Sequence, residues 1–288
     1  MGVSLTGKLP DSPTASNTLH WVLRLGIFMC FLGHGSFGII AKPEWTTLFS
    51  VAGIPSDAAF RLMPFIGLHD LTIAALVLAS PRPLVLLWAT IWCLWTAALR
   101  PIVGLGMWEF LERAGNYGPP LALLLLQPWP RSLREWFAPI KPGPASAERL
   151  RACGLVLRVS IALLLIGHAG FGAFQHKAVL LNMYSTAGLP ASLGSVSLGP
   201  AIGWFELLLA AAVLMKPFRS LLLFVCVYKI ASELLYPMTG SFWWEFIERG
   251  GDYTAPIALI VVNGLLAAKD SRVPAVAAFA PAAVVQKP

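Results

Sequence analysis

Two histidines at matching places in the sequence are the first residues that could do chemistry. His34 lies within GHGSFG and His168 within GHAGFG, each in the second half of a long apolar run. Ionisable groups inside such runs are costly and often mark a pathway or a binding site. An imidazole titrates near neutral pH, so each ring could exchange protons or hydrogen-bond a polar headgroup. The alternative is that each ring hydrogen-bonds a neighbouring helix where the glycines allow close packing.

The match between the histidines belongs to an internal duplication. Residues 24–38 align with 158–172, 66–78 with 202–214, and 108–117 with 244–253. The offset drifts only from 134 to 136 residues, so the insertions fall in loops. We therefore predict two copies of one structural unit.

Further polar residues could complete a site with each histidine. Asp70 in the first copy and Glu206 in the second are expected at about the depth of the histidines, where each carboxylate could pair with the imidazole. Such a pair could also be purely structural, since desolvation offsets its attraction. Arg100 precedes Pro101 near the end of the third apolar run and could join the set in the first copy.

The second copy departs from this pattern. Tyr236 stands where the first copy has Arg100, and Phe205 stands where it has His69. The second copy also gains Lys229 and Glu233, which are four residues apart and so share one face of a helix. We expect a single site to be asymmetric and favour the first copy.

The segments WEFLERAGNY and WEFIERGGDY are the most specific repeated feature. As helices they place Glu109 four residues from Arg113, and Glu245 four residues from Arg249, so each pair can neutralise itself. One interpretation is a structural cap with Trp and Tyr in the headgroup region. The other is a lid that carries carboxylates over a pocket, which adds these candidate ligand-binding or proton-handling residues: Glu109, Glu112, Arg113, Glu245, Glu248 and Arg249.

The elements that position these residues are predicted to be membrane helices. Hydrophobic residues make up 57% of the 288 residues and charged residues only 12%. Six apolar runs approach the roughly 20 residues that cross a bilayer as a helix: 21–40, 62–79, 84–105, 155–174, 198–215 and 218–238. Two shorter runs, 117–129 and 253–268, reach that length only if the charged segment before each joins the helix.

We therefore predict an all-α membrane protein with eight transmembrane helices in two parallel-oriented four-helix repeats. The net charge of +7 comes from basic residues beside the helix ends, as the positive-inside rule expects, and no nucleic acid partner is predicted. Both termini are expected in the cytoplasm. The expected divisions are an N-terminal segment (1–19), the first repeat (20–129), a basic cytoplasmic linker (130–153), the second repeat (154–268) and a disordered tail (269–288).

The chain resembles the DoxX-like family of bacterial membrane proteins, including its DoxD type. The resemblance rests on residues 33–38, 112–120, 167–172 and 248–256 and covers most of 21–268, where the family's four-helix unit occurs twice. It implies a bacterial inner membrane and a redox neighbourhood, because some members are linked to thiosulfate:quinone oxidoreduction. No settled catalytic set can be carried over.

Three functions remain open from the sequence. The first is a redox-associated subunit that binds a quinone or similar lipid-soluble molecule between its helices, with redox proteins as partners in the lipid bilayer. The second is a carrier for a small solute or proton. The third is a scaffold for a membrane complex. The cofactor stays undetermined; no metal site is predicted, and no second ligand spacing favours haem. The four cysteines form no CxxC pair, so no thiol relay is expected.

Overall fold

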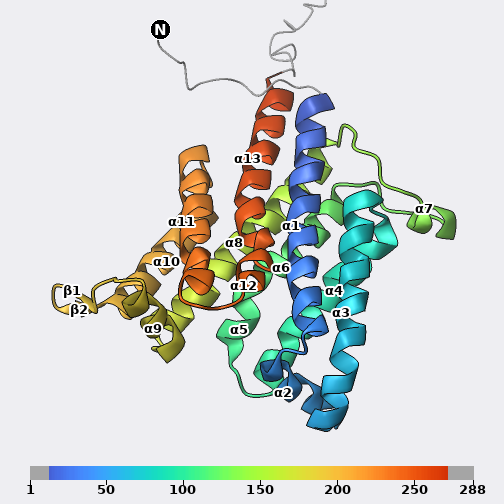
Figure 1. Ribbon diagram of the computed structural model, residues 1–288. Helices are drawn as coiled ribbons and strands as arrows, with labels where there is room; N and C mark the ends of the chain where they lie inside the picture. The colour runs from blue at the N-terminus through green and yellow to red at the C-terminus, as the bar shows by residue number, and fades with distance from the viewer. Residues whose placement is uncertain (1–12, 272–288) are drawn as a thin grey trace, which may run out of the picture.

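The computed structural model describes residues 13–271, which fold into a bundle of long helices with short helices between them (Figure 1). The expected N-terminal segment and tail lie largely outside these residues. Among the described residues, the first helix begins at Pro13 and the last helix ends at Asp270, so both of these helices extend beyond the predicted apolar runs. Proline is well placed at a helix start, because the first N–H groups of a helix have no partner within it.

The first half of the chain forms long helices joined by short ones. Its elements are α1 (Pro13–Ile39), η1 (Pro43–Trp45), α2 (Thr46–Phe49), η2 (Ser50–Ala52), α3 (Ser56–Ala79), α4 (Pro83–Ile102), α5 (Met107–Glu112) and α6 (Ala114–Leu125). The linker holds α7 (Leu133–Phe137), which begins where the Ser132 side chain accepts a hydrogen bond from the Glu135 backbone N–H.

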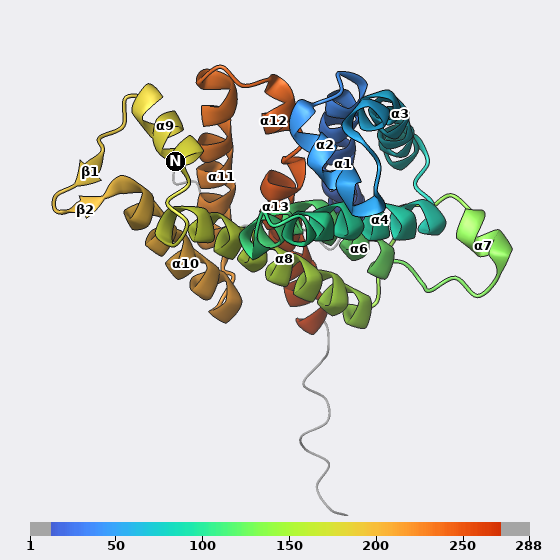
Figure 2. The same ribbon diagram turned by 90° about the horizontal axis from the view of Figure 1, so that it is seen from below.

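The second half follows a similar order of elements. It contains α8 (Ala147–Ala173), α9 (Ala178–Thr186), a hairpin of β1 (Ser192–Leu193) and β2 (Val196–Ser197), α10 (Leu198–Met215), α11 (Arg219–Met238), α12 (Trp243–Ile247) and α13 (Gly250–Asp270). The hairpin is antiparallel, and it lies at the edge of the molecule beside α10 in both views (Figures 1 and 2).

Seven helical segments within residues 13–271 are long and apolar enough to cross a membrane. They include all six long runs predicted from the sequence, and the seventh joins α12 to α13. The chain is therefore an all-α, multi-pass membrane protein. The run predicted at 117–129 forms only the 12-residue α6, which ends shortly before Pro128. Proline lacks the N–H that would continue the helical bonding.

The two halves interlock rather than stand apart. α1 packs on α3 and also on α13, while α8 packs on α10 and also on α6. Figure 2 shows α8 and α13 between the α1–α4 group and the α9–α11 group, with α6 beside α4. The buried core runs through this centre, with side chains such as Leu23, Phe31, Leu157 and Val262.

Glycines permit the closest of these approaches. A Cβ on Gly33 of α1 would lie 2.5 Å from the backbone nitrogen of Glu248, and a Cβ on Gly167 of α8 would overlap that of Glu112. Each glycine-rich segment therefore brings its histidine against the Trp-Glu-Phe segment of the other half.

Arginines secure the other end of the same helices. Arg24 donates from Nε to the Val77 carbonyl at 3.1 Å, and Arg158 donates from Nε to the Val213 carbonyl at 3.1 Å. These carbonyls belong to the last turns of α3 and α10, where the helix leaves its acceptors unpaired. The buried Arg24 thus anchors α1 to α3, and the half-buried Arg158 anchors α8 to α10 in the same way.

Candidate ligand cavity and charge cluster

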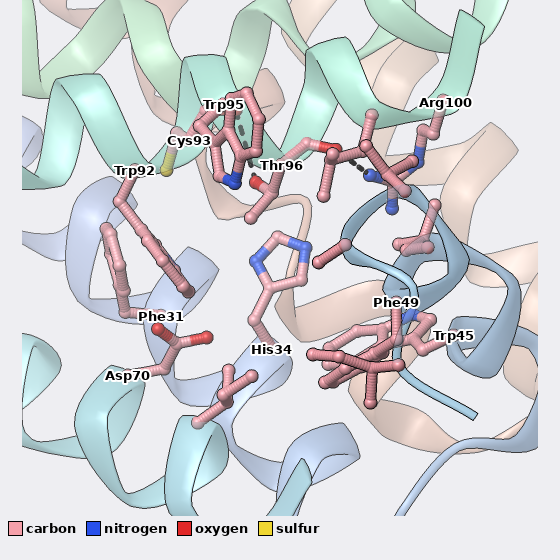
Figure 3. Close-up of a pocket in the computed structure, with 16 residues that line it drawn as sticks. Phe31, His34, Trp45, Phe49, Asp70, Trp92, Cys93, Trp95, Thr96 and Arg100 are labelled. Carbon is pink, nitrogen blue, oxygen red and sulfur yellow. Dashed lines mark hydrogen bonds between the residues drawn. The ribbon is translucent and has the colours of Figure 1, made fainter. Parts of the chain in front are cut away.

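The first half encloses a cavity of about 190 Å³ between α1, α3, α4 and the short helices of residues 43–54. His34, Asp70 and Arg100 each line it from a different long helix (Figure 3). The rest of the lining is mainly apolar and includes Phe31, Trp45, Phe49, Trp92, Trp95 and Leu99. An apolar chamber with a few convergent polar groups is the usual form of a small-molecule site.

Figure 3 shows the His34 ring at the centre of the cavity, between Asp70 on one side and Thr96 on the other. Its Nε2 lies 3.5 Å from Oε2 of Glu248, and its Nδ1 lies 3.5 Å from the Cys30 sulfur. Glu248 belongs to the second half. The predicted pairing of His34 with Asp70 is therefore replaced by a pairing across the halves, although both residues line the same cavity.

Asp70 is held by a chain of hydrogen bonds that leads out of the cavity. The Trp88 indole donates to Nε2 of His69 at 2.8 Å, so the other nitrogen of this neutral ring carries the proton. That nitrogen, Nδ1, lies 2.9 Å from Oδ1 of Asp70 and donates to it. His69 is outside the cavity lining and fixes the carboxylate that lies in it.

Arg100 reaches the cavity from the last turn of α4 and is 6% exposed. One guanidinium nitrogen donates to the Thr96 carbonyl at 2.6 Å. A guanidinium carries five N–H donors, so this bond leaves others that can face a ligand. Arg100 is the fixed positive charge in the cavity lining.

A second group of candidates forms a buried charge cluster where the halves meet. Arg113 donates to Glu109 at 2.7 Å and to Glu112 at 2.6 Å, and Arg249 donates to Glu245 and Glu248 at 3.0 Å each. The two pairs predicted at a spacing of four residues are confirmed. The arrangement also adds contacts between the halves, since Nη2 of Arg249 lies 3.6 Å from Glu112.

His168 also lies in this cluster. Its Nε2 is 3.6 Å from Glu112 of the first half and 3.6 Å from Glu233 of the second. The two histidines are thus crossed, each against the glutamate of the other half's repeated segment. Both crossings follow from the glycine contacts of α1 and α8.

The interior of the second half contains a buried ion pair. Lys229 and Glu233 are 0% and 1% exposed, and their ion pair measures 2.5 Å. Arg249 adds a contact to Glu233 at 2.9 Å. Glu206, the counterpart of Asp70, accepts a hydrogen bond from the Tyr228 hydroxyl at 2.9 Å and is not paired with His168.

Two lysines that the sequence reading missed complete the crossed pattern. Lys42 pairs with Glu245 at 2.5 Å, and Lys177 pairs with Glu109 at 2.5 Å. The two lysines are 135 residues apart, which is the repeat offset, and that spacing could have identified them.

Comparison of the chain with known protein families, curated proteins and solved structures finds no match.

Proposed function

We propose that this chain is a DoxX-like membrane protein that binds a quinone or similar lipid-soluble molecule in the cavity of its first half. The observation that carries the proposal is the convergence of His34, Asp70 and Arg100 on one mainly apolar chamber. In this proposal the chain is a subunit of a redox assembly in the bacterial inner membrane.

The chemistry of the lining fits a quinone headgroup. A quinone presents two carbonyl oxygens that only accept hydrogen bonds, and Arg100 supplies a buried donor with charge. The His34 imidazole can donate from one ring nitrogen. Aromatic side chains around it provide flat apolar surfaces for the ring. Trp95 lines the cavity and is also 51% exposed, so the chamber reaches the outer surface of the bundle, where an isoprenoid tail could extend into lipid.

The proposal includes the finer topology of two parallel repeats and eight spans, with α5 and α6 together forming the fourth span. α1 begins and α13 ends at the same end of the bundle (Figure 1), which an even number of crossings requires. The matched bonds of Arg24 and Arg158 support parallel copies. Basic residues beside this end favour a cytoplasmic location for both termini.

Quinone binding can be tested on the purified full-length protein. Decylubiquinone should quench the fluorescence of tryptophans at the cavity, and His34→Gln or Asp70→Asn should weaken the quenching. The matched control is Glu206→Gln, which changes the counterpart of Asp70 outside the cavity. Quenching that is equally strong in all four proteins would remove the assignment to this cavity. Extraction of the purified protein followed by mass spectrometry would show which lipid-soluble molecule it carries.

A proton or small-solute carrier is the second candidate. The crossed contacts of His34 with Glu248 and of His168 with Glu112 place ionisable groups at the junction of the halves, where carriers built from repeats hold their substrate. Sealed vesicles containing only this protein would then show proton flux under an imposed potential. Flux no faster than in protein-free vesicles, over a range of pH, would count against a proton carrier.

A further inference from the structure

Buried acids outnumber buried bases around the junction of the halves. Six carboxyl groups are buried in this part of the molecule against three buried basic groups, and the half-buried residues there add two acids and three bases: Glu109, Glu245, Arg113, Lys42 and Lys177. The buried acids are Asp70, Glu112, Glu206, Glu233, Glu248 and Asp252, and the buried bases are Arg100, Lys229 and Arg249. An unpaired buried charge is so costly that the group takes up a proton instead. The surplus indicates that this region holds protons.

Among the acids of the cluster, Asp252 is the one whose negative charge is least compensated by neighbouring basic groups. It is 2% exposed, and no Lys or Arg nitrogen in residues 13–271 lies within 4.0 Å of its carboxyl oxygens. The ionisable groups that face it are Lys229 and Glu233 from α11, Glu112 from α5, His168 from α8 and Arg249 before α13. The two basic groups among them are already bound to Glu233.

A small polar void lies beside Asp252. It measures about 10 Å³ and is lined by Glu112, Arg113, Asn116, Glu248, Arg249 and Asp252. A void of roughly this size with several polar partners holds one water molecule. Such a water would connect Asp252 to Glu112 and Glu248, which are the partners of the two histidines.

The same neighbourhood offers a set of metal ligands but does not fit a metal. One ligand atom each of His168, Glu233 and Asp252 lies within 4.8 Å of the others, and Nε2 of His168 has no hydrogen-bond partner among residues 13–271. Glu233, however, already binds Lys229 at 2.5 Å and Arg249 at 2.9 Å. A divalent cation would have to share this carboxylate with two positive charges, whereas a proton adds only one charge and needs only one partner.

We propose that Asp252 and the adjoining void hold an exchangeable proton, which passes through Glu248 and His34 to the ligand in the cavity. Glu248 faces Nε2 of His34 at 3.5 Å, so the ring takes up a proton there, and the same ring lines the cavity that would hold the ligand. The route moves protons only. It rests on the proposed function for its last step, while the proton store itself does not.

A quinone site has a use for such a store. Reduction of a quinone to the quinol takes up two electrons and two protons, and each carbonyl oxygen becomes a hydroxyl. The store supplies one of these protons, and the aqueous buffer supplies the other. The electrons come from a reduced partner protein, or from sodium dithionite in the experiment below. The apolar lining restricts access of bulk water, so a built-in donor would serve the headgroup oxygens.

Infrared difference spectroscopy on the full-length protein in lipid vesicles tests the store. We expect a carbonyl band of protonated carboxyl at neutral pH that shifts in D₂O. Asp252→Asn should remove part of it, and this substitution installs the residue that the first half has at Asn116. Asp270→Asn, at an exposed carboxylate, should leave the band intact. Wild-type protein without such a band, or an Asp252→Asn band equal to wild type, would overturn the store.

The delivery step is tested by adding decylubiquinone and then dithionite to the same vesicles. Reduction should change the Asp252 band in the wild type. In Glu248→Gln this change, measured relative to the amount of quinone bound, should be absent. A wild-type band that is unaffected by reduction of bound quinone, or a change that persists in Glu248→Gln, would overturn delivery. If neither the wild type nor the variants bind decylubiquinone, the proposed function and the delivery step are both overturned. The infrared band of protonated carboxyl would still show whether Asp252 stores a proton.

Discussion

The two halves differ most at one place, where α4 and α11 face the centre of their own half. Cys93 and Ala97 of α4 correspond at an offset of 136 residues to Lys229 and Glu233 of α11. Cys93 lines the cavity of about 190 Å³, whereas Lys229 and Glu233 form a buried ion pair. Two small side chains of the first half thus correspond to two large charged ones, which form an internal salt bridge in the second half.

The difference extends to the acid on the neighbouring helix. Asp70 is held by His69 and Trp88, and Glu206 is held by Tyr228, because Phe205 and Phe224 stand where the first half has His69 and Trp88. What the halves share is the crossed contact of each histidine with a glutamate of the other half. The two halves therefore share the histidine–glutamate contacts that join them, and they differ in the interior of each half.

Breaking the ion pair of the second half should have the largest effect. Glu233→Ala leaves Lys229 buried without its partner, and removal of one member of a buried pair costs about 3–5 kcal/mol. The free energy of unfolding measured by denaturant titration in detergent micelles should fall by that amount.

The control for this prediction converts the second half into the first. Lys229→Cys with Glu233→Ala installs the residues of Cys93 and Ala97 and removes the unpaired charge together with its partner. The double variant should therefore be more stable than Glu233→Ala alone. A double variant less stable than the single one would show that Lys229 is not held by this pair.

Substitution of the glycines that join the two halves should lower stability nearly as much, and by a similar amount in both halves. Gly33→Ala and Gly167→Ala each place a Cβ against the backbone of a glutamate, and such overpacking costs about 1–3 kcal/mol. Thermal unfolding followed by circular dichroism should show a lower midpoint for both. Gly143→Ala is the matched control, because no atom lies within 4 Å of a Cβ there. Losses confined to one half would contradict the similarity of the two halves at these contacts.

Loss of the charge in the cavity should affect binding more than folding. Arg100→Met removes a charged hydrogen-bond donor, which is worth about 1.5–3 kcal/mol and so weakens decylubiquinone binding roughly tenfold or more. The dissociation constant from fluorescence quenching measures this. Tyr236→Phe, at the matching position of the second half, should leave the constant within about twofold of wild type. Equal constants in wild type and Arg100→Met would exclude Arg100 from the site.

The helices were predictable from the sequence because span length and apolar composition are local properties. All six long runs form helices, and the spacing of Glu109 to Arg113 and of Glu245 to Arg249 fixed two ion pairs in advance. The repeat also identified the asymmetric positions.

The partners of the histidines were not predictable in the same way. Each copy contains a carboxylate at a suitable depth, so pairing within a copy was expected. The structure instead packs α1 against α13 and α8 against α6, and the glycines bring the backbone of Glu248 or Glu112 beside the histidine. The cavity similarly forms only because residues 43–54 fold back along α3, and this tertiary contact cannot be predicted from hydropathy.

The smallest predicted effect concerns a residue that does not touch the cavity. Trp88→Phe removes the donor to His69 and installs the residue found at Phe224 of the second half. One neutral hydrogen bond is worth about 0.5–1.5 kcal/mol, so the affinity for decylubiquinone should fall by roughly twofold to tenfold. The loss is indirect, because His69 becomes free to turn and no longer fixes the Asp70 carboxylate.

Pairing this substitution with Asp70→Asn sharpens the comparison between the halves. If Trp88 acts only through His69 and Asp70, the double variant should bind no more weakly than Asp70→Asn alone, since residues in one hydrogen-bonded network are not additive. Losses that simply add would show that Trp88 affects the ligand by another route, and the chain from Trp88 to Asp70 would then be structural, as the tyrosine contact of Glu206 is in the second half.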